Sequence, residues 1–308
     1  MNNSINDILE IILITYNRKE YLENTLKQIL ASNSPLCDLD ITILNNKSND
    51  GTNELINEYC QNFKNIKHII HNKNIGGNAN IARAFEIASK KYVWVLCDDD
   101  NYDFAHFDEV IEAIKNNNDI ILTSQYDLGK KENIATILRQ LTFLPSAIYK
   151  TENITNDVMQ NIMYNISNMF PHLILGISII NKKGSIHVCK HQIITPDRIV
   201  QDYNRGFNNS HPYYQNMFWV VGFINTCQYI QDKHTKDFVI NNFKPQKSNF
   251  FTTISTEFKY NSLIYNNFIK NTLDVFAGLN FYQRIQFLLA IVWLNIVYIV
   301  KKFILHKI

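Results

Sequence analysis

The sequence lacks a strong net charge. Its 308 residues include 30 Lys and Arg against 28 Asp and Glu, which gives a formal net charge of +2. A protein dedicated to nucleic acid needs a positive field to attract phosphates, so we expect no nucleic acid among its partners. The hydrophobic share of 46% is ordinary for a globular protein and provides apolar material for one large core or two smaller ones.

The sequence also lacks paired cysteines. Its five cysteines are odd in number, lie far apart and form no CxxC motif. We therefore expect neither a disulfide framework nor a zinc site, and reduced cytosolic thiols fit better. His187 and His191 flank Cys189, but the sequence offers no clear set of further ligands. The first residues, MNNSINDILEIILIT, have no basic region or small-residue cleavage site, so no secretory signal is expected.

The first 125 residues alternate strand and helix patterns. We expect strands at 7–15, 40–44, 66–70, 92–96 and 119–123, and helices at 18–32, 50–63, 78–90 and 104–115. Strands separated by such helices form right-handed βαβ units, so the pattern predicts a doubly wound α/β fold with a mostly parallel sheet. Beyond residue 130 the alternation breaks down, with short strands expected at 144–150 and 184–190 and aromatic-rich helices after them.

The last stretch, residues 283–308, is strongly apolar. Its run from Ile285 to Val300 is shorter than the ~20 residues that a membrane-spanning helix needs. Arg284 precedes this run, and Lys301 and Lys302 follow it. Two interpretations stay open: a core helix that closes the domain, or a helix in the plane of a membrane with its lysines at the headgroups.

The segment YVWVLCDDDNYD, residues 92–103, places Asp98, Asp99 and Asp100 directly after a continuous apolar run. Such a run is typical of a strand buried on both faces, and ligands bind beyond the carboxyl ends of such strands in α/β sheets. A solvated acidic turn is the alternative. Mn²⁺ or Mg²⁺, which prefer oxygen ligands, would relieve the repulsion between the carboxylates and neutralise a departing diphosphate.

Three more polar segments follow the earlier expected strands: TYNR (15–18), NNKSNDGT (45–52) and NKNIGGNAN (72–80). All four should meet at one edge of the sheet, where loops can close around a nucleotide. The chain has no GxxxxGK[ST] motif and no GxGxxG after the first strand, which excludes a P-loop enzyme and disfavours a dinucleotide-binding domain. A phosphatase with an aspartyl nucleophile would place its carboxylates after the first strand, and a sugar nucleotidyltransferase would have a glycine-rich loop there.

The ordered set TYNR, NNKSNDGT, NIGGNANIARA and VLCDDD resembles glycosyltransferase family 2, whose members have the GT-A fold. The resemblance covers residues 8–125 and fades beyond them. Within the family, YVWVLCDDD and YNISNMFPHL (164–173) are similar to bacterial abequosyltransferase-like enzymes of surface-polysaccharide assembly. The resemblance implies inverting transfer of a hexosyl or deoxyhexosyl group from a nucleotide-diphosphate sugar to a hydroxyl of an oligosaccharide or lipid-linked acceptor, in capsule, lipooligosaccharide or O-antigen synthesis.

The resemblance also implies roles for residues that match the family's motifs. The metal and the ribose would be held by Asp98 and by Asp99 or Asp100, with the register ambiguous by one residue and Asp100 counted among the catalytic residues. The expected substrate-binding residues are Thr15, Tyr16, Asn17 and Arg18 at the base, Asn45, Asn46, Asp50 and Gly51 in the second loop, and Gly76, Gly77 and Arg83 near the diphosphate and sugar.

Two departures from the family's pattern are informative. Asn45 stands where the family commonly has an Asp that accepts the uracil N3–H, and an amide can accept or donate, so cytidine or another base is a hypothesis. No Glu-Asp pair stands where the family has its catalytic base. We expect His172 to be that base, with Asp157 and Asp197 as weaker alternatives, and Ser146 to line the acceptor site.

These expectations predict a division of the chain into three parts. Residues 1–125 would bind the nucleotide sugar, residues 126–210 the acceptor, and residues 211–308 would form a helical, apolar extension. We expect a cytoplasmic protein on the inner face of the cytoplasmic membrane, with the membrane surface as a further partner. The missing Glu-Asp pair leaves a catalytically silent GT-A module as the alternative, and a metal-dependent hydrolase of nucleotide diphosphates as a third.

Overall fold

The structure, a computed structural model, describes residues 5–123, 133–166, 168, 170–196 and 222–242, and single positions between 281 and 300. The chain forms two compact units. The first comprises residues 1–167 and 171–201, and the second residues 168–170 and 202–308. The predicted division into donor and acceptor halves at residue 125 stays a prediction, although one sheet continues across that point.

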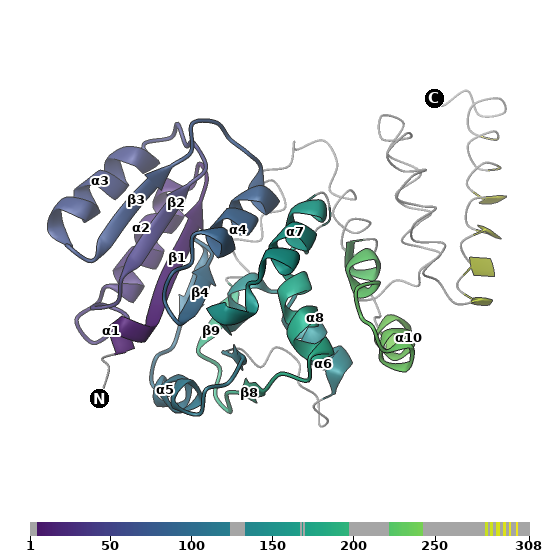
Figure 1. Ribbon diagram of the computed structural model, residues 1–308. Coiled ribbons are helices and arrows are strands. Elements are labelled where there is room, and N and C mark those ends of the chain that lie inside the picture. Colours follow the sequence, from purple (N-terminus) through teal and green to yellow (C-terminus); the bar gives the residue numbers. More distant parts are fainter. Residues whose placement is uncertain are drawn as a thin grey trace. The chain divides into compact units, whose positions relative to one another are not determined.

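The first unit contains, within the described residues, a sheet of seven strands in the order β3-β2-β1-β4-β7-β6-β8 (Figure 1). The strands are β1 (Leu9–Thr15), β2 (Ile41–Asn45), β3 (Ile66–Ile70), β4 (Tyr92–Leu96), β6 (Ile120–Leu122), β7 (Ala147–Lys150) and β8 (Ile186–Val188). The helices are α1 (Ile5–Ile8), α2 (Lys19–Ile29), α3 (Thr52–Asn62), α4 (Gly77–Glu86), α5 (Asp108–Lys115), α6 (Ile134–Gln140), α7 (Asn156–Tyr164) and α8 (Leu173–Asn181). Two 3₁₀ turns, η1 (Leu144–Ser146) and η2 (Thr151–Asn153), flank β7.

The strands β3, β2, β1 and β4 are mutually parallel, which confirms the expected βαβ units. β1 pairs with β2 up to Thr15 and Asn45, and with β4 up to Leu13 and Leu96. Because these strands end in register, the segments that follow them emerge at the same edge of the sheet.

The order of the later strands differs from a simple parallel continuation. β7 lies between β4 and β6 and is antiparallel to both, while β6 pairs in parallel with β8 on its other side. All three residues of β6 are buried, so its backbone needs a partner on each edge. The antiparallel insertion supplies one of them from more than twenty residues further along the chain, which the local sequence pattern does not reveal.

The apolar runs are buried because helices cover both faces of the sheet. Alternate residues of β1 and β4 point to one face and share a core with α2, α3 and α5; the strand members of that core include Leu9, Ile11, Leu13, Tyr92, Trp94 and Leu96. On the other face, Phe85 of α4 packs edge-on against Tyr149 of β7, with ring centroids 5.9 Å apart.

The acidic segment begins a second, two-stranded sheet that the sequence did not predict. β5 (Asp100–Tyr102) pairs antiparallel with β9 (Ile194–Pro196). On the other edge of β5, Gln28 of α2 donates from Nε2 to the carbonyl of Asp100 at 3.2 Å and accepts from the amide of Tyr102 at 3.1 Å. An amide side chain thus takes the place of a further strand and fixes the backbone of Asp100.

The second unit is described in part. Residues 222–227 are helical, and α10 spans Lys233–Asn242. Phe170 packs edge-on against Phe223, with ring centroids 6.4 Å apart. No helix in the described part of the chain has the length and apolar character needed to span a bilayer. Between 281 and 300, the described side chains include several exposed apolar ones, namely Phe281, Tyr282, Ile285, Leu288, Leu289, Val292, Trp293 and Ile296.

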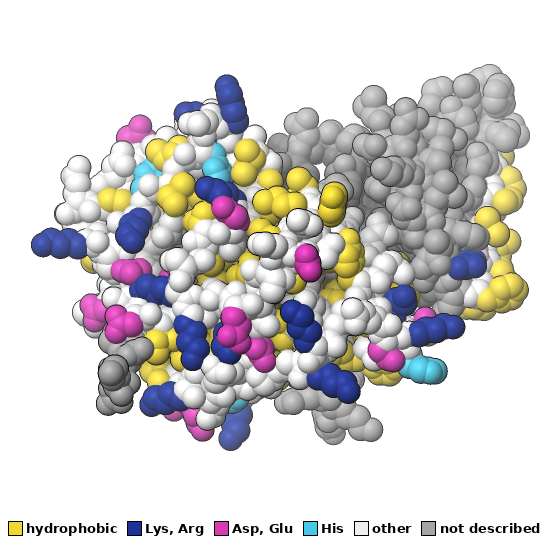
Figure 2. Space-filling model, viewed as in Figure 1, with side chains coloured by type: hydrophobic (Ala, Val, Ile, Leu, Met, Phe, Trp, Pro, Cys, Tyr) yellow, Lys and Arg dark blue, Asp and Glu magenta, His cyan; other side chains and the backbone are white. Residues whose placement is uncertain are grey.

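Charged side chains of both signs are interspersed over the face of the described residues that Figure 2 shows. This distribution agrees with the small net charge of +2.

The contacts of Gln28 generate a stability prediction. Gln28→Leu leaves the Asp100 carbonyl and the Tyr102 amide without their side-chain partner, and we expect it to lower the free energy of unfolding by about 1–3 kcal/mol. Urea denaturation measures the change. Asn24→Leu, an exposed amide one turn earlier on α2, is the matched control and should stay within about 0.5 kcal/mol of wild type. Equal stability of the two variants would contradict the bracing role of Gln28.

Candidate functional site

The segments after β1, β2 and β3 are joined by hydrogen bonds at the carboxyl edge of the sheet. The amide of Asn17 donates to Ser48 Oγ at 2.9 Å, and Asn17 Oδ1 accepts from the amide of Asn49 at 2.8 Å. Asn46 connects the second segment to the third, because its Nδ2 donates to Asn74 Oδ1 at 2.8 Å and its Oδ1 accepts from the amide of Ile75 at 2.9 Å. The expected convergence of these loops is therefore present.

Arg18 and Thr15 hold the start of the acidic segment. Arg18 Nη1 lies 2.9 Å from Asp98 Oδ1 and 2.8 Å from Asp99 Oδ2, so one nitrogen bridges two carboxylates. Thr15 Oγ1 donates to the other oxygen of Asp98 at 2.6 Å. From the sequence we expected a metal ion to neutralise these aspartates, whereas in the structure the guanidinium of Arg18 pairs with Asp98 and Asp99.

Asp98 is 2% exposed, and this burial dominates its ionisation. Burial raises the pKa of Asp98 to about 6, even though the Arg18 charge and the hydrogen bonds from Thr15 and Arg18 lower it. Both of its oxygens already have partners, so Asp98 is suited to positioning Arg18 and Thr15.

Asp99 and Asp100 offer a different arrangement. One carboxylate oxygen from each lies within 4.8 Å of the other and of Cys97 Sγ, an arrangement that could hold a metal ion. Two carboxylates suit Mn²⁺ or Mg²⁺, while the thiol is a poor ligand for either ion, and burial raises the pKa of Cys97 well above its ordinary value. The geometry therefore favours Asp99 and Asp100 over Asp98 as metal ligands.

Asn45 lies at the end of β2 and is fully buried. Its Oδ1 accepts from the amide and hydroxyl of Ser48, at 3.0 and 2.7 Å, and its Nδ2 donates to Asn53 Oδ1 at 2.7 Å. In this structure its amide shapes the second loop, while Tyr16 is 37% exposed on the first. An exposed ring at that position can stack on a base.

Asp50 closes the second loop against α2 and α3. Its Oδ2 accepts from the amide of Lys19 at 3.1 Å, and its Oδ1 accepts from the amide of Thr52 at 3.2 Å. Burial raises the pKa of Asp50, but these hydrogen bonds and the one from the Thr52 hydroxyl outweigh it, so the pKa is lowered overall. Gly51 follows with φ at +88°, a backbone conformation that L side chains rarely adopt. In the NDGT sequence, Asp50 therefore accepts backbone hydrogen bonds and Gly51 provides the positive φ that the loop requires.

Gly76 and Gly77 lie at the amino-terminal end of α4. Gly76 has φ at +87°, and a Cβ added at either glycine would meet nothing within 4 Å. This open space beside a helix start can admit an anionic ligand. Arg83 lies six residues further along α4, about 9 Å along the helix axis, and forms an ion pair with Glu86. Its guanidinium therefore engages a carboxylate of its own helix.

The two residues predicted to act on the acceptor side, Ser146 and His172, are buried. Ser146 is fully buried and donates to the carbonyl of Gln140 at 2.9 Å. His172 is 3% exposed, its Nε2 lies 3.0 Å from the carbonyl of Leu141, and burial lowers its pKa to about 4. These contacts support structural roles for Ser146 and His172. They do not support the predicted roles of Ser146 in the acceptor site and of His172 as the catalytic base. Asp157 is exposed on the first turn of α7, and Asp197 lies outside the described residues.

Sequence reasoning missed three contributors to this edge: Gln28, Ser48 and the pairing of Arg18 with the aspartates. Ser48 follows Asn45 by three residues, a spacing at which an Asn side chain caps the backbone of a turn, so this contact had a local signal. Gln28 and Arg18 meet residues more than seventy positions away, and no local pattern indicates such contacts.

The burial of Asp98 predicts a dependence of stability on pH. Its folded pKa of about 6 exceeds the ordinary value, so its contribution to stability is present at low pH and is lost as the pH rises from about 4 to about 6. We expect wild type to lose on the order of 1–3 kcal/mol relative to Asp98→Asn over this range. Denaturant unfolding of both proteins at several pH values measures the difference.

Asp103→Asn provides the control, because Asp103 is an exposed carboxylate on the same segment. The stability difference between wild type and this variant should stay nearly flat from pH 4 to 6. An equally flat difference for Asp98→Asn would contradict the raised pKa.

Comparison with known proteins identifies relatives of this chain. Residues 10–176 match the model of Glycosyl transferase family 2, which is more than half of the chain. Abequosyltransferase RfbV of Salmonella typhimurium is 33% identical over 94 residues, which cover 30% of this chain and 28% of that protein. An uncharacterized glycosyltransferase of Methanocaldococcus jannaschii, MJ1057, is 32% identical over 117 residues, which cover 37% of this chain and 40% of that protein. The matched segments thus span less than half the length of these relatives.

Solved structures share the fold. Residues 1–349 of Staphylococcus aureus TarS superpose with a TM-score of 0.60 and 16% identity, over 88% of this chain and 80% of that one. The mannosyltransferase PcManGT from Pyrobaculum calidifontis, in complex with GDP-Man and Mn²⁺, has a TM-score of 0.50 and 12% identity, over 93% of this chain and 86% of that one. With its mostly parallel sheet flanked by helices, this chain has the GT-A fold and belongs to glycosyl transferase family 2.

Proposed function

We propose that this glycosyltransferase moves a sugar, with inversion, from a nucleotide-diphosphate donor to an acceptor hydroxyl in the assembly of a bacterial surface polysaccharide. The observation that carries the proposal is the position of Asp99 and Asp100, whose carboxylates share one potential ion site at the carboxyl edge of the parallel strands. The match to abequosyltransferase RfbV supports the transfer of a sugar, and the complexes of TarS with UDP-GlcNAc and of PcManGT with GDP-Man support a nucleotide-sugar donor. The polysaccharide setting rests on the resemblance of the YVWVLCDDD and YNISNMFPHL segments to enzymes of surface-polysaccharide assembly.

Different loops contribute different parts of the proposed donor site. Tyr16 and the first loop border the base, and the buried Asn45 and Asn46 hold the second loop in shape beside it. The open space at Gly76 and Gly77 lets the diphosphate approach the backbone amides at the start of α4. Because Asn45 replaces the family's usual aspartate, tolerance of cytidine or another base remains part of the proposal.

A divalent cation fits the chemistry of the residues present. Mn²⁺ or Mg²⁺ would be held by Asp99 and Asp100, whose hard oxygens leave coordination positions for phosphate oxygens and water. When bound, such an ion neutralises the charge that develops on the departing nucleotide diphosphate. Arg18 fixes Asp99 from one side, so this carboxylate is oriented before any ligand arrives.

Inversion requires a base that accepts the proton of the acceptor hydroxyl as the hydroxyl attacks the anomeric carbon. His172 remains the proposed base on chemical type, although its burial and its bond to Leu141 would have to change for it to reach an acceptor. Asp157 and Asp197 are the alternatives. A folded His172→Gln protein that keeps its turnover would exclude His172.

Donor binding tests the proposed function directly. In a thermal-shift panel of UDP-, CDP-, GDP- and dTDP-sugars, we expect one nucleotide class to stabilise the protein only when Mn²⁺ is present. A ligand at 100 times its dissociation constant stabilises the folded state by about 2.7 kcal/mol, which such a panel detects. Asp100→Asn should abolish the shift because it removes one of the two carboxylates that hold the ion.

Asp103→Asn is the matched control for the panel and should retain the full shift, since Asp103 lies outside the cluster. No shift with any donor would refute the site. A shift without turnover on any acceptor would leave a silent GT-A module, and release of free sugar without an acceptor would indicate a hydrolase.

We further propose that the segment from residue 281 onward rests on the inner face of the cytoplasmic membrane. Among its described positions, Phe281, Ile285, Leu289, Val292 and Ile296 are exposed apolar residues three or four positions apart. In the sequence, Arg284, Lys301, Lys302 and Lys307 provide positive charge for anionic headgroups. Exposed apolar side chains beside basic residues are typical of segments that lie in a membrane interface.

Vesicle binding tests this location. We expect wild type to co-sediment with vesicles that contain anionic lipid, and Leu289→Glu with Trp293→Glu to reduce the bound fraction severalfold, because carboxylates oppose burial beside acyl chains. Thermal unfolding of the variant distinguishes this loss from misfolding. Unchanged vesicle binding would contradict the proposed membrane contact, and a variant that unfolds would indicate that the segment belongs to the protein core.

A further inference from the structure

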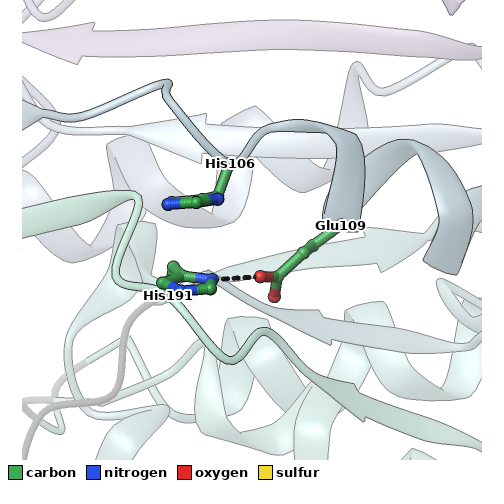
Figure 3. Close-up of side chains that lie close together, drawn as sticks. All are labelled: His106, Glu109 and His191. Carbon is green, nitrogen blue, oxygen red and sulfur yellow. Dashed lines mark hydrogen bonds and ion pairs between the residues drawn. The ribbon is translucent and has the colours of Figure 1, made fainter.

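A second cluster of ligating side chains lies in the first unit and shares no residue with the acidic triplet. His106 precedes α5, Glu109 lies in the first turn of α5, and His191 lies between β8 and β9. Figure 3 shows these three side chains gathered together, with the ring of His191 directed at the Glu109 carboxylate and lying beside the ring of His106.

The contacts within this cluster are close. His191 Nδ1 lies 2.5 Å from Glu109 Oε1, and the amide of Lys190 donates to the other oxygen of Glu109 at 2.5 Å. The rings of His106 and His191 stack with centroids 3.6 Å apart and an interplanar angle of 16°. One ligating atom from each of His106, Glu109 and His191 lies within 4.8 Å of the other two.

The residue types in this cluster are those of zinc sites. Zn²⁺ binds imidazole nitrogen and carboxylate oxygen at about 2.0–2.2 Å, so ligand atoms around a tetrahedral ion lie roughly 3.3–3.5 Å apart. For all three atoms to surround one ion, His191 Nδ1 and Glu109 Oε1 would separate from their present 2.5 Å, and the stacked rings would tilt so that their nitrogens converge. Two imidazoles and one carboxylate favour Zn²⁺ or a similar transition metal over Mg²⁺, which prefers oxygen ligands throughout.

Two further ligating residues border the cluster. Glu109, His187 and Cys189 form an overlapping group whose ligating atoms also lie within 4.8 Å of one another. Nε2 of His187 is buried and has no hydrogen-bond partner among the described residues, and Cys189 is fully buried. His106 and His191 are exposed, so an ion from solution reaches their side of Glu109 directly.

We propose that His106, Glu109 and His191 bind a Zn²⁺ ion, with the fourth position open to water. The ion would connect the segment before β9 to α5. β9 pairs with β5, which begins at Asp100, and the amide of Asp103 donates to the carbonyl of Ile193 at 2.9 Å. Zinc at this position would therefore stabilise the backbone that presents Asp100. The sequence alone disfavoured zinc, because its cysteines form no CxxC motif and no clear further ligands accompany His187 and His191. His106 and Glu109 lie about eighty residues before His191 in the chain.

Zinc titration of the full chain, expressed without a polyhistidine tag and first stripped with a chelator, tests the proposal. Competition with a chromophoric chelator measures affinity, and Co²⁺ substitution reports the ligand geometry through its visible absorption. We expect one Zn²⁺ per chain, and at least about a hundredfold weaker binding in His106→Gln and in His191→Gln. Circular dichroism in the presence of chelator verifies that both variants are folded.

Two controls separate this site from others. His234→Gln removes an exposed histidine on α10 and should leave zinc affinity unchanged. Asp100→Asn should also retain zinc binding, which keeps this test independent of the proposed donor site. Hydrogen exchange at residues 100–103 and 193–196 should slow when Zn²⁺ binds. Failure of wild type to bind Zn²⁺ would overturn the proposal, as would full affinity in both histidine variants or loss of binding only in His187→Gln or Asp100→Asn.

Discussion

The bridge from Arg18 to Asp98 and Asp99 is the interaction on which the candidate site depends. Three adjacent carboxylates at the end of a buried strand would repel one another, and burial makes the ionised form of Asp98 still less favourable. A single guanidinium nitrogen within 2.9 Å of two of them offsets much of this cost. The same bridge joins the loop after β1 to the loop after β4. One contact therefore both neutralises the carboxylates and holds these two loops together.

The surrounding residues extend this arrangement to the neighbouring loops. Thr15 binds the other oxygen of Asp98, Asn46 connects the second and third loops, and Gln28 holds the backbone of β5 from α2. Thr15 and Asn46 lie at the edge of the sheet and Gln28 lies on α2. The hydrophobic core holds the sheet and α2 in place. The result is a set of carboxylates and amides oriented before a ligand binds, which is the condition for electrostatic stabilisation of a leaving group.

Much of the fold could be predicted from the sequence, because local hydrophobic patterns indicate the strands and helices of the parallel half of the sheet. Apolar runs predicted the strands β1 to β4, and the polar loops after them predicted the edge of the sheet at which a ligand would bind. The antiparallel insertion of β7 and the pairing of β5 with β9 depend on residues far apart in the chain. Local periodicity carries no information about such neighbours.

The sequence predicted which loops form the candidate site, and the hydrogen bonds in the structure distinguish the roles of the three aspartates. The triplet left the metal register ambiguous, and the structure separates Asp98, whose two oxygens have protein partners, from Asp99 and Asp100. Ser146 and His172 were chosen by residue type alone, and their burial could not be inferred from the sequence. The histidine cluster was not predicted for a related reason. In the sequence, β6, β7 and β8 lie between Glu109 and His191, so no local pattern joins the members of the cluster.

A crystal structure of the protein with Mn²⁺ and a nucleotide diphosphate would show which of the three aspartates hold the ion. Anomalous scattering from manganese locates the ion independently of the protein coordinates. The assignment of the ion to Asp99 and Asp100 predicts one strong peak in contact with these two carboxylates and with the phosphates, while Asp98 stays bound to Arg18 and Thr15. A nucleotide bound without a peak at these residues, or with manganese on Asp98 alone, would contradict it.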